Sequence, residues 1–423
     1  MNITIVGAGI SGLSAAFELQ KSGFEVTILE GSERLGGKIL TSEIEGFNID
    51  AGPDSFLTRD PEMRDLCFAL GVGDELVPPT GKPAKVWVGG EMHSLPKRHF
   101  LGVPLDLDEL EGLSLLTEEG AKRAKLDLTL PDNKPKKGET VGSLIRRRLG
   151  DEVMDRLVGP LLGGINAGDA DDLCLESGVP QLFNASQGDS SLVRSVQDFL
   201  KNQNRDPTSP VFLTHPDGLE TVVKRLEQAI DSDIRRNERV TSVEISDNSI
   251  VVKGSQEYQS DAVILCIPAF SAAKILHGSC PNTSNLLAGI QYASMAFITF
   301  AFNKGDVSEF NGSGFLVGRD EDLLTTACSW TSEKWAHLKN NDTVFLRLSV
   351  GRFDDTEALD MEDDTLIEKL KGELATLTGI KANPIATRVT RWPYSFPQYE
   401  LGHGEKVNAI RQQVAVEMPG MFL

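Results

Sequence analysis

The sequence predicts an α/β fold in which a largely parallel sheet is joined by an α+β part and a helical insertion. Two observations predict this. The chain opens with a strand, a glycine-rich turn, a helix and a second strand, which is the order of a βαβ unit. Strand-like and helix-like patterns alternate later in the chain, with helical patterns dominating about 112–201. A chain of 423 residues is too long for one simple core, so two or three domains are expected.

The opening βαβ unit has clear limits. Ile3–Val6 is a β-branched run typical of a buried parallel strand. Leu13–Leu19 is predicted to be helical, and Gly23 ends that helix. Glu25–Leu29 forms the predicted second strand, which leads directly to an acidic residue at its carboxyl end.

The turn between the first strand and the helix carries the pattern G-x-G-x-x-G, which predicts a Rossmann-like dinucleotide site. Gly7 permits the tight turn, Gly9 allows close approach of a pyrophosphate, and Gly12 allows the helix to pack on the strand. The helix N-terminus offers N–H groups to phosphates. The carboxylate that follows the second strand can accept hydrogen bonds from ribose hydroxyls. The residues expected to bind are Gly7, Gly9, Ile10, Ser11, Gly12 and Glu30.

The segment Glu33–Lys38 favours FAD over NAD. A glycine pair beside basic residues places main-chain N–H groups and positive charge near the pyrophosphate. The segment resembles the extended FAD fingerprint that amine oxidases, phytoene desaturases and porphyrinogen oxidases share. The expected contacts are Arg34, Gly36, Gly37 and Lys38.

Three later segments resemble the oxygen-dependent porphyrinogen oxidases of haem synthesis, in that family's order and spacing. They are Gly46–Phe56, Leu161–Asp169 and Arg391–Tyr399. The second segment has Asn where the family usually has Tyr, which puts that local contact in question. The resemblance implies further FAD contacts at Gly52, Pro53, Asp54, Ser55, Val240 and Trp392, and substrate-facing positions at Gly164 and Asn166.

The resemblance also implies the reaction. FAD and O2 would oxidise a porphyrinogen, either coproporphyrinogen III or protoporphyrinogen IX, with H2O2 as the second product. The flavin N5 would perform the chemistry, so no catalytic side chain is assigned. Cations for the substrate carboxylates are expected at Arg59, Lys85 and Arg98. Handover of the product to ferrochelatase is a further expectation, and the oligomeric state is left open.

The composition indicates which classes of partner are excluded and where in the cell the protein is expected. A formal net charge of -20 argues against nucleic acid, which needs basic patches, and against tight binding to an anionic membrane. No apolar stretch is long enough to span a bilayer, and the N-terminus enters a strand pattern instead of a signal peptide. A cytoplasmic location is expected, with peripheral membrane contact left open. The five cysteines form no C-x-x-C pair and the six histidines are scattered, so no metal site is expected.

The predicted FAD domain is discontinuous and comprises residues 1–79, 211–276 and 389–423. A mainly helical insertion is expected over 80–210 and a substrate domain with a mixed sheet over 277–388. Thr140–Leu149 is predicted to be a capped amphipathic helix, with Arg146–Arg148 forming a solvated face. Contact of this run with a substrate propionate or with a membrane is the lesser alternative. The stretch Asn202–Pro210 is expected to be a linker.

Two alternatives remain open at this stage. An amine oxidase or carotenoid desaturase would share Gly7–Gly37, although only four tyrosines disfavour an aromatic cage. A truncated, non-catalytic FAD-binding homologue is the second alternative. In the resembling family, the segment corresponding to Pro419–Leu423 precedes a glycine-rich loop and a helix that contact the flavin. Weak FAD retention is therefore expected if the product ends at Leu423.

Overall fold

The computed structural model describes residues 1–131, 134–188, 190–203, 209–246 and 249–423. The chain forms two compact units, each assembled from separated stretches of sequence. Unit 1 comprises Met1–Val77, Val211–Gln291 and Gly404–Leu423, and unit 2 comprises Pro78–Pro210 and Tyr292–His403. The chain therefore passes between the units four times.

Unit 1 is built around a parallel five-stranded sheet with the order β11-β2-β1-β15-β21. Side chains alternate between its two faces: Ile3 and Ile5 belong to one buried cluster, and Val6 belongs to the other. Burial on both faces is what a β-branched parallel strand requires. The strands are β11 (Asp233–Arg235), β2 (Glu25–Leu29), β1 (Asn2–Val6), β15 (Ala262–Leu265) and β21 (Met421–Phe422).

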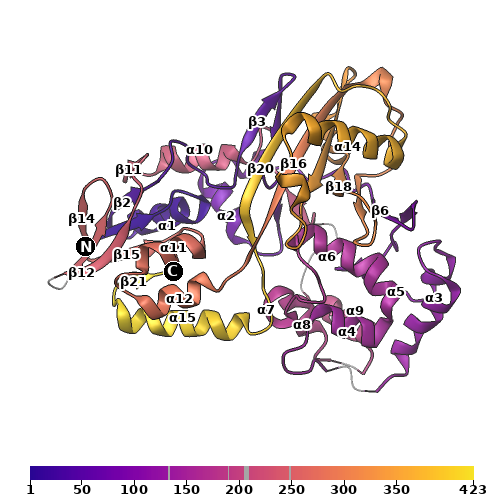
Figure 1. Ribbon diagram of the computed structural model, residues 1–423, viewed down its shortest axis with the longest axis horizontal. Coiled ribbons are helices and arrows are strands. Elements are labelled where there is room, and N and C mark those ends of the chain that lie inside the picture. The colour runs from indigo at the N-terminus through magenta and orange to yellow at the C-terminus, as the bar shows by residue number, and fades with distance from the viewer. Residues whose placement is uncertain (132–133, 189, 204–208, 247–248) are drawn as a thin grey trace. The chain divides into compact units, whose positions relative to one another are not determined.

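Helices cover both faces of this sheet (Figure 1). One cluster joins the sheet to α1 (Ile10–Lys21) and α10 (Glu220–Ala229), and the other joins it to α11 (Ala269–Leu276), α12 (Pro281–Ala288) and α15 (His403–Glu417). The smaller elements of unit 1 are β3 (Thr41–Ile44), β4 (Phe47–Asp50), β5 (Phe56–Leu57), α2 (Glu62–Ala69), η1 (Gly73–Glu75), β10 (Phe212–Leu213), β12 (Ser242–Ser246), β13 (Ser249–Lys253) and β14 (Glu257–Ser260).

Unit 2 contains a seven-stranded sheet with the order β20-β16-β19-β18-β17-β6-β7, in which only β17 and β6 are parallel neighbours. Helix α14 (Asp363–Thr378) packs on it through Leu366, Leu370 and Leu374, which share one helical face. The strands are β20 (Ala386–Pro397), β16 (Tyr292–Asn303), β19 (Thr343–Val350), β18 (Thr325–Ser329), β17 (Gly314–Val317), β6 (Ala84–Val88) and β7 (Glu91–Ser94).

The rest of unit 2 is mainly helical, and its core includes Val86 and Val88 of β6. Three of its helices run without interruption over 151–166, with a π turn in the middle. The helices are η2 (Glu109–Gly112), α3 (Glu118–Lys125), η3 (Leu126–Leu128), α4 (Val141–Leu149), α5 (Asp151–Val153), η4 (Met154–Val158), α6 (Gly159–Asn166), α7 (Leu175–Gly178), α8 (Pro180–Ala185) and α9 (Leu192–Asn202). Short elements complete it: β8 (His99–Phe100), β9 (Val103–Pro104), η5 (Lys304–Asp306), α13 (Thr331–Lys334), η6 (Ala336–Leu338) and η7 (Glu357–Leu359).

The compact units divide the chain differently from the expected domains in three main respects. Residues 277–291, which include α12, belong to unit 1 and not to the expected substrate domain, because α12 packs in the same buried cluster as α11 and α15. The helical stretch and the mixed sheet belong to one unit, because β6 belongs to both the sheet and the helical core. Residues 389–403 belong to unit 2, because β20 pairs with β16 along most of its length. In the expected linker, Asn202 is the last residue of α9, and residues 204–208 lie outside the described residues.

The expectation that Arg146–Arg148 forms a solvated face is wrong. Arg148 is buried and its Nε lies 2.6 Å from Asp127 Oδ1. Arg147 Nε lies 2.6 Å from Glu139 Oε1, and Arg146 contacts three aspartates. These acidic partners come from other segments, so the short run itself gave no sign of them.

Within the described residues, none of the helices combines the length and apolar character that crossing a bilayer demands. The same residues contain no cluster of three or more His, Cys, Asp or Glu side chains arranged to hold a metal ion. All five cysteines are free thiols, and four of them are buried.

Candidate cofactor site and an arginine-lined pocket

The fold itself requires two of the three glycines of the first turn, and the third has no such requirement. Gly7 has a φ of +100°, and a Cβ there would lie 2.7 Å from Cys266 O. A Cβ on Gly12 would lie 1.9 Å from Gly7 O, so the helix could not approach the strand. Gly9 has an ordinary φ of -69°, and its Cβ would meet nothing nearer than Gly37 Cα at 4.0 Å. The fold thus leaves an open, side-chain-free surface at Gly9.

Helix α1 begins beside that open surface. Gly9 is its N-cap, and the first helical hydrogen bond runs from Leu13 N to Gly9 O at 3.0 Å. The N–H groups of Ile10, Ser11 and Gly12 therefore lie ahead of the helical ladder. The first turn contains no acidic side chain. The arrangement suits an anionic group such as a pyrophosphate.

Glu30 lies directly after β2 and is held beside the same turn. Its Oε2 accepts a hydrogen bond from Ala8 N at 2.8 Å. Its Oε1 accepts from Ser32 N at 2.9 Å and from Ser32 Oγ at 2.7 Å. These three donors fix the orientation of the carboxylate, and the contact with a ribose stays a prediction.

The second glycine pair packs against the first. Gly36 N donates to Ala8 O at 2.8 Å, and Gly36 and Gly37 have φ values of +95° and +58°. Arg34 donates to Leu35 O at 3.0 Å, to Ile39 O at 2.7 Å and to Gly37 O. Its guanidinium therefore braces the loop through main-chain carbonyls. Burial lowers the pKa of the Lys38 ammonium.

The other expected FAD residues of unit 1 lie on nearby connections. Asp50 Oδ1 accepts from Thr41 Oγ1 at 2.6 Å and from Leu219 N at 3.0 Å, which fixes the entry to Gly52 and Pro53. Ser55 Oγ donates to Asp54 Oδ1 at 3.0 Å. Glu238 N donates to Glu30 O at 2.8 Å, so the segment leading to Val240 runs alongside Glu30.

Trp392 belongs to unit 2, whereas all the other expected FAD residues belong to unit 1. It lies on β20 and pairs with Met295 of β16. The three residues expected to bind carboxylates are also divided: Arg59 belongs to unit 1, where it contacts Asp60 at 3.0 Å, and Lys85 and Arg98 belong to unit 2. Lys85 lies on β6 between Phe315 and Ser94.

Gly164 and Asn166 lie on α6, and each lines a cavity of unit 2. Asn166 O accepts from Gln398 Nε2 at 3.0 Å in the smaller cavity. The larger one, here called the arginine pocket, has a volume of about 180 Å³. Three arginines border it, namely Arg146, Arg319 and Arg352. Sequence reasoning considered a propionate contact for Arg146 only as the lesser alternative to a solvated face, and it missed Arg319 and Arg352, which come from two loops of the sheet. Neither Lys85 nor Arg98 lines this pocket.

Comparisons with known proteins agree over almost the whole chain. A family model described as flavin containing amine oxidoreductase matches residues 10–423. The coproporphyrinogen III oxidase of Bacillus subtilis is 33% identical over 100% of this chain and 92% of its own length. The protein of that name from Staphylococcus aureus is 30% identical over 99% of this chain and 92% of its own. A crystal structure from Exiguobacterium sp. 255-15, described as a candidate protoporphyrinogen oxidase, is 30% identical, with a TM-score of 0.89 and coverage of 100% and 93%.

Proposed function

Because the chain belongs to the family of flavin-containing amine oxidoreductases, we propose that it is an FAD-dependent oxidase that converts coproporphyrinogen III to coproporphyrin III in haem biosynthesis. O2 is the proposed electron acceptor and H2O2 the second product. Support comes from relatives at 30–33% identity that bear the name of this activity and match nearly the full chain.

The observation that carries the assignment of the cofactor is the open surface at Gly9. The fold requires glycine at Gly7 and Gly12 but not at Gly9. A glycine that the protein does not need for itself is explained by a ligand that must approach the backbone. FAD fits this place: its pyrophosphate would face the first turn of α1, and Glu30 would bind a ribose hydroxyl.

When bound, FAD supplies the two-electron redox chemistry. The residues of this chain supply binding and orientation. In the proposal, main-chain N–H groups of Ile10–Gly12 hold the pyrophosphate, and Arg34 keeps the Gly36–Gly37 loop against it by bonding that loop's carbonyls. Gly52–Ser55, Val240 and Trp392 remain predicted contacts.

Coproporphyrinogen III carries four carboxylates, and protoporphyrinogen IX carries two. The relatives at 30–33% identity are named for coproporphyrinogen III. We therefore place coproporphyrinogen III first and protoporphyrinogen IX second.

The test is oxidation by the purified holoprotein. Anaerobic addition of coproporphyrinogen III should bleach the flavin absorption, and air should restore it while fluorescent porphyrin and H2O2 appear. Protoporphyrinogen IX is expected to react with a lower kcat/KM. Putrescine serves as an amine control and should leave the flavin oxidised. A protein that binds no flavin, or that is reduced by the amine and by neither porphyrinogen, would contradict the proposal.

A further inference from the structure

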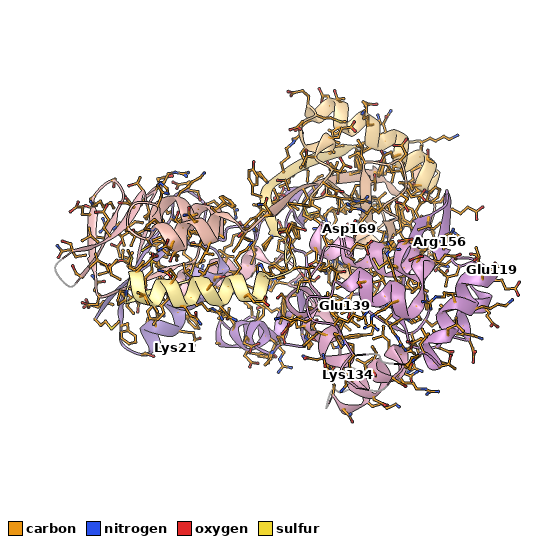
Figure 2. The ribbon with its side chains drawn as sticks, turned by 60° about the horizontal axis from the view of Figure 1, so that its bottom comes forward. Lys21, Glu119, Lys134, Glu139, Arg156 and Asp169 are labelled. Carbon is orange, nitrogen blue, oxygen red and sulfur yellow. The ribbon has the colours of Figure 1, made fainter. Side chains whose placement is uncertain are left out.

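The arginine pocket lies wholly within unit 2, between the helical part and two loops of the sheet. One wall is the face of α6 that carries Gly159, Pro160 and Gly163, so no long side chain projects from it. Val317 and Thr326 of the sheet also line the pocket. Figure 2 labels Asp169, which borders the pocket on the loop after α6.

The three arginines of the pocket differ in how well their charge is balanced. Arg146 lies 2.6 Å from Asp155, 2.7 Å from Asp171 and 3.1 Å from Asp151. Arg319 Nε lies 2.9 Å from Asp169 Oδ2, and its Nη2 contacts Asp354. Both cations therefore have at least two carboxylate partners.

Arg352 is the exception. Its guanidinium donates to two main-chain carbonyls, Arg319 O at 3.2 Å and Val317 O at 3.5 Å. Among the described residues, no carboxylate forms an ion pair with it. Burial and the charge of Arg319 lower the pKa of Arg352, and the charges of Asp355, Asp354 and Asp169 only partly oppose this. A half-buried cation without a bound counter-ion is costly, and a carboxylate ligand would relieve that cost.

The size and surroundings of the pocket suit one arm of a larger ligand. About 180 Å³ is below the roughly 300–1,000 Å³ typical of sites that enclose a whole drug-sized molecule. Two apolar side chains, Ile165 and Phe353, are exposed directly after the pocket residues Gly164 and Arg352. Phe353 N donates to Ala167 O at 2.8 Å, so these two segments are joined. Exposed apolar side chains on the two segments that border a half-buried cation suit a ligand with an apolar ring system and carboxylate arms.

We propose that the arginine pocket binds one propionate arm of the tetrapyrrole substrate, with Arg352 as the ligand of its carboxylate. The inference rests on the proposed function. It assigns substrate binding to a residue that has no part in the FAD site, since Arg352 and the glycine turn belong to different units.

Binding of coproporphyrin III to the holoprotein tests the inference directly, because the porphyrin's own fluorescence reports its Kd. Arg352→Gln should weaken binding roughly tenfold or more, as expected for loss of a hydrogen bond to a charged group. Arg352→Lys should retain part of the affinity, since it keeps the charge but loses the planar fork. In turnover with coproporphyrinogen III, Arg352→Gln should raise KM and leave kcat nearly unchanged.

Arg156→Gln is the matched control. Arg156 also bonds a main-chain carbonyl, Leu115 O at 3.1 Å, but it does not line the pocket; Figure 2 labels it in the helical part of unit 2. The neutral tetramethyl ester of coproporphyrin III supplies a control on the ligand side. The wild type should bind the ester more weakly than the acid, and Arg352→Gln should bind the ester as the wild type does.

The outcomes separate the inference from the proposed function. If the wild type binds and oxidises the porphyrinogen while a folded Arg352→Gln binds coproporphyrin III unchanged, only the pocket assignment is overturned. An equal loss for the acid and the ester would overturn it too, because the loss would then not involve a carboxylate. If the wild type neither binds nor oxidises any porphyrin compound, the proposed function is wrong, and the pocket assignment falls with it.

Discussion

At the scale of single residues, one glycine motif serves two separable purposes. Gly7 and Gly12 are demanded by the protein's own backbone, through a positive φ and a close helix–strand approach respectively. Gly9 meets neither demand. Stability and cofactor binding should therefore respond to different members of the motif.

Gly9→Ala should weaken FAD binding at least tenfold while changing the free energy of unfolding of the apoprotein by less than about 1 kcal/mol. Its methyl group would enter the open space where the pyrophosphate is expected. Gly12→Ala should instead destabilise the apoprotein by about 1–3 kcal/mol, since its Cβ would overlap Gly7 O. Flavin titration and urea unfolding of both apoproteins measure the two effects. Equal loss of stability in the two variants would refute this separation.

Arg34 illustrates what a motif cannot reveal about a residue. The sequence placed a positive charge near the pyrophosphate, and the glycine pair beside it has the two positive φ values that such a loop needs. The guanidinium, however, is bonded to the carbonyls of Leu35, Gly37 and Ile39. The directions in which these carbonyls point depend on the backbone conformation of the loop. The residue types alone do not specify that conformation, so these contacts of Arg34 could not be predicted from the sequence.

At the scale of elements, the buried pair Arg148–Asp127 joins the helices of unit 2. Asp127 Oδ1 accepts from Leu192 N at 3.1 Å, and its Oδ2 accepts from Val193 N at 3.0 Å, so the carboxylate lies at the N-terminus of α9. Arg148, at the end of α4, also donates to Ser190 O at 2.6 Å. One ion pair thus connects η3, α4 and α9.

Asp127→Ala should lower the free energy of unfolding by about 3–5 kcal/mol, because it leaves Arg148 buried without a counter-ion. The double variant Asp127→Leu/Arg148→Met should recover much of that loss, since it removes both charges and fills the space. Asp198→Ala is the control, because its pair with Lys201 on α9 is exposed and should be worth less than about 1 kcal/mol. Chemical unfolding followed by circular dichroism measures all three. A double variant less stable than Asp127→Ala would contradict this account.

Elements with a strong local pattern were predictable. Glu25–Leu29 is a strand with the expected bounds. Thr140 caps α4, with Ser143 N donating to Thr140 Oγ1 at 3.1 Å. The partners of Arg146–Arg148 were missed, because their aspartates and glutamate come from separate segments and meet only in the folded unit. The same reason hid the arginine pocket.

At the scale of the whole molecule, each compact unit is assembled from stretches that are far apart in the sequence. The discontinuity of the FAD-binding part was expected, but strand pairing of β20 with β16 decides that residues 389–403 belong to unit 2. Register between strands almost a hundred residues apart depends on tertiary packing that a single sequence does not state. Each of the four buried hydrophobic clusters is contained within one unit.

Separate cores predict separate responses to ligands. A ligand that binds only the native form of a unit stabilises that unit by about 2.7 kcal/mol at 100 times its Kd. In calorimetry of the apoprotein we expect two transitions. FAD should raise the transition of unit 1 more than that of unit 2, where Trp392 is its one predicted contact, and coproporphyrin III should raise the transition of unit 2 more. Gly9→Ala should abolish the first shift and Arg352→Gln should reduce the second, and hydrogen exchange in β1 and in β19 assigns each transition to its unit. In the part of the chain that the structure describes, none of the four buried clusters spans both units. A single transition that both ligands move equally would therefore mean that contacts outside these cores couple the units, and the division of binding roles argued here would fail.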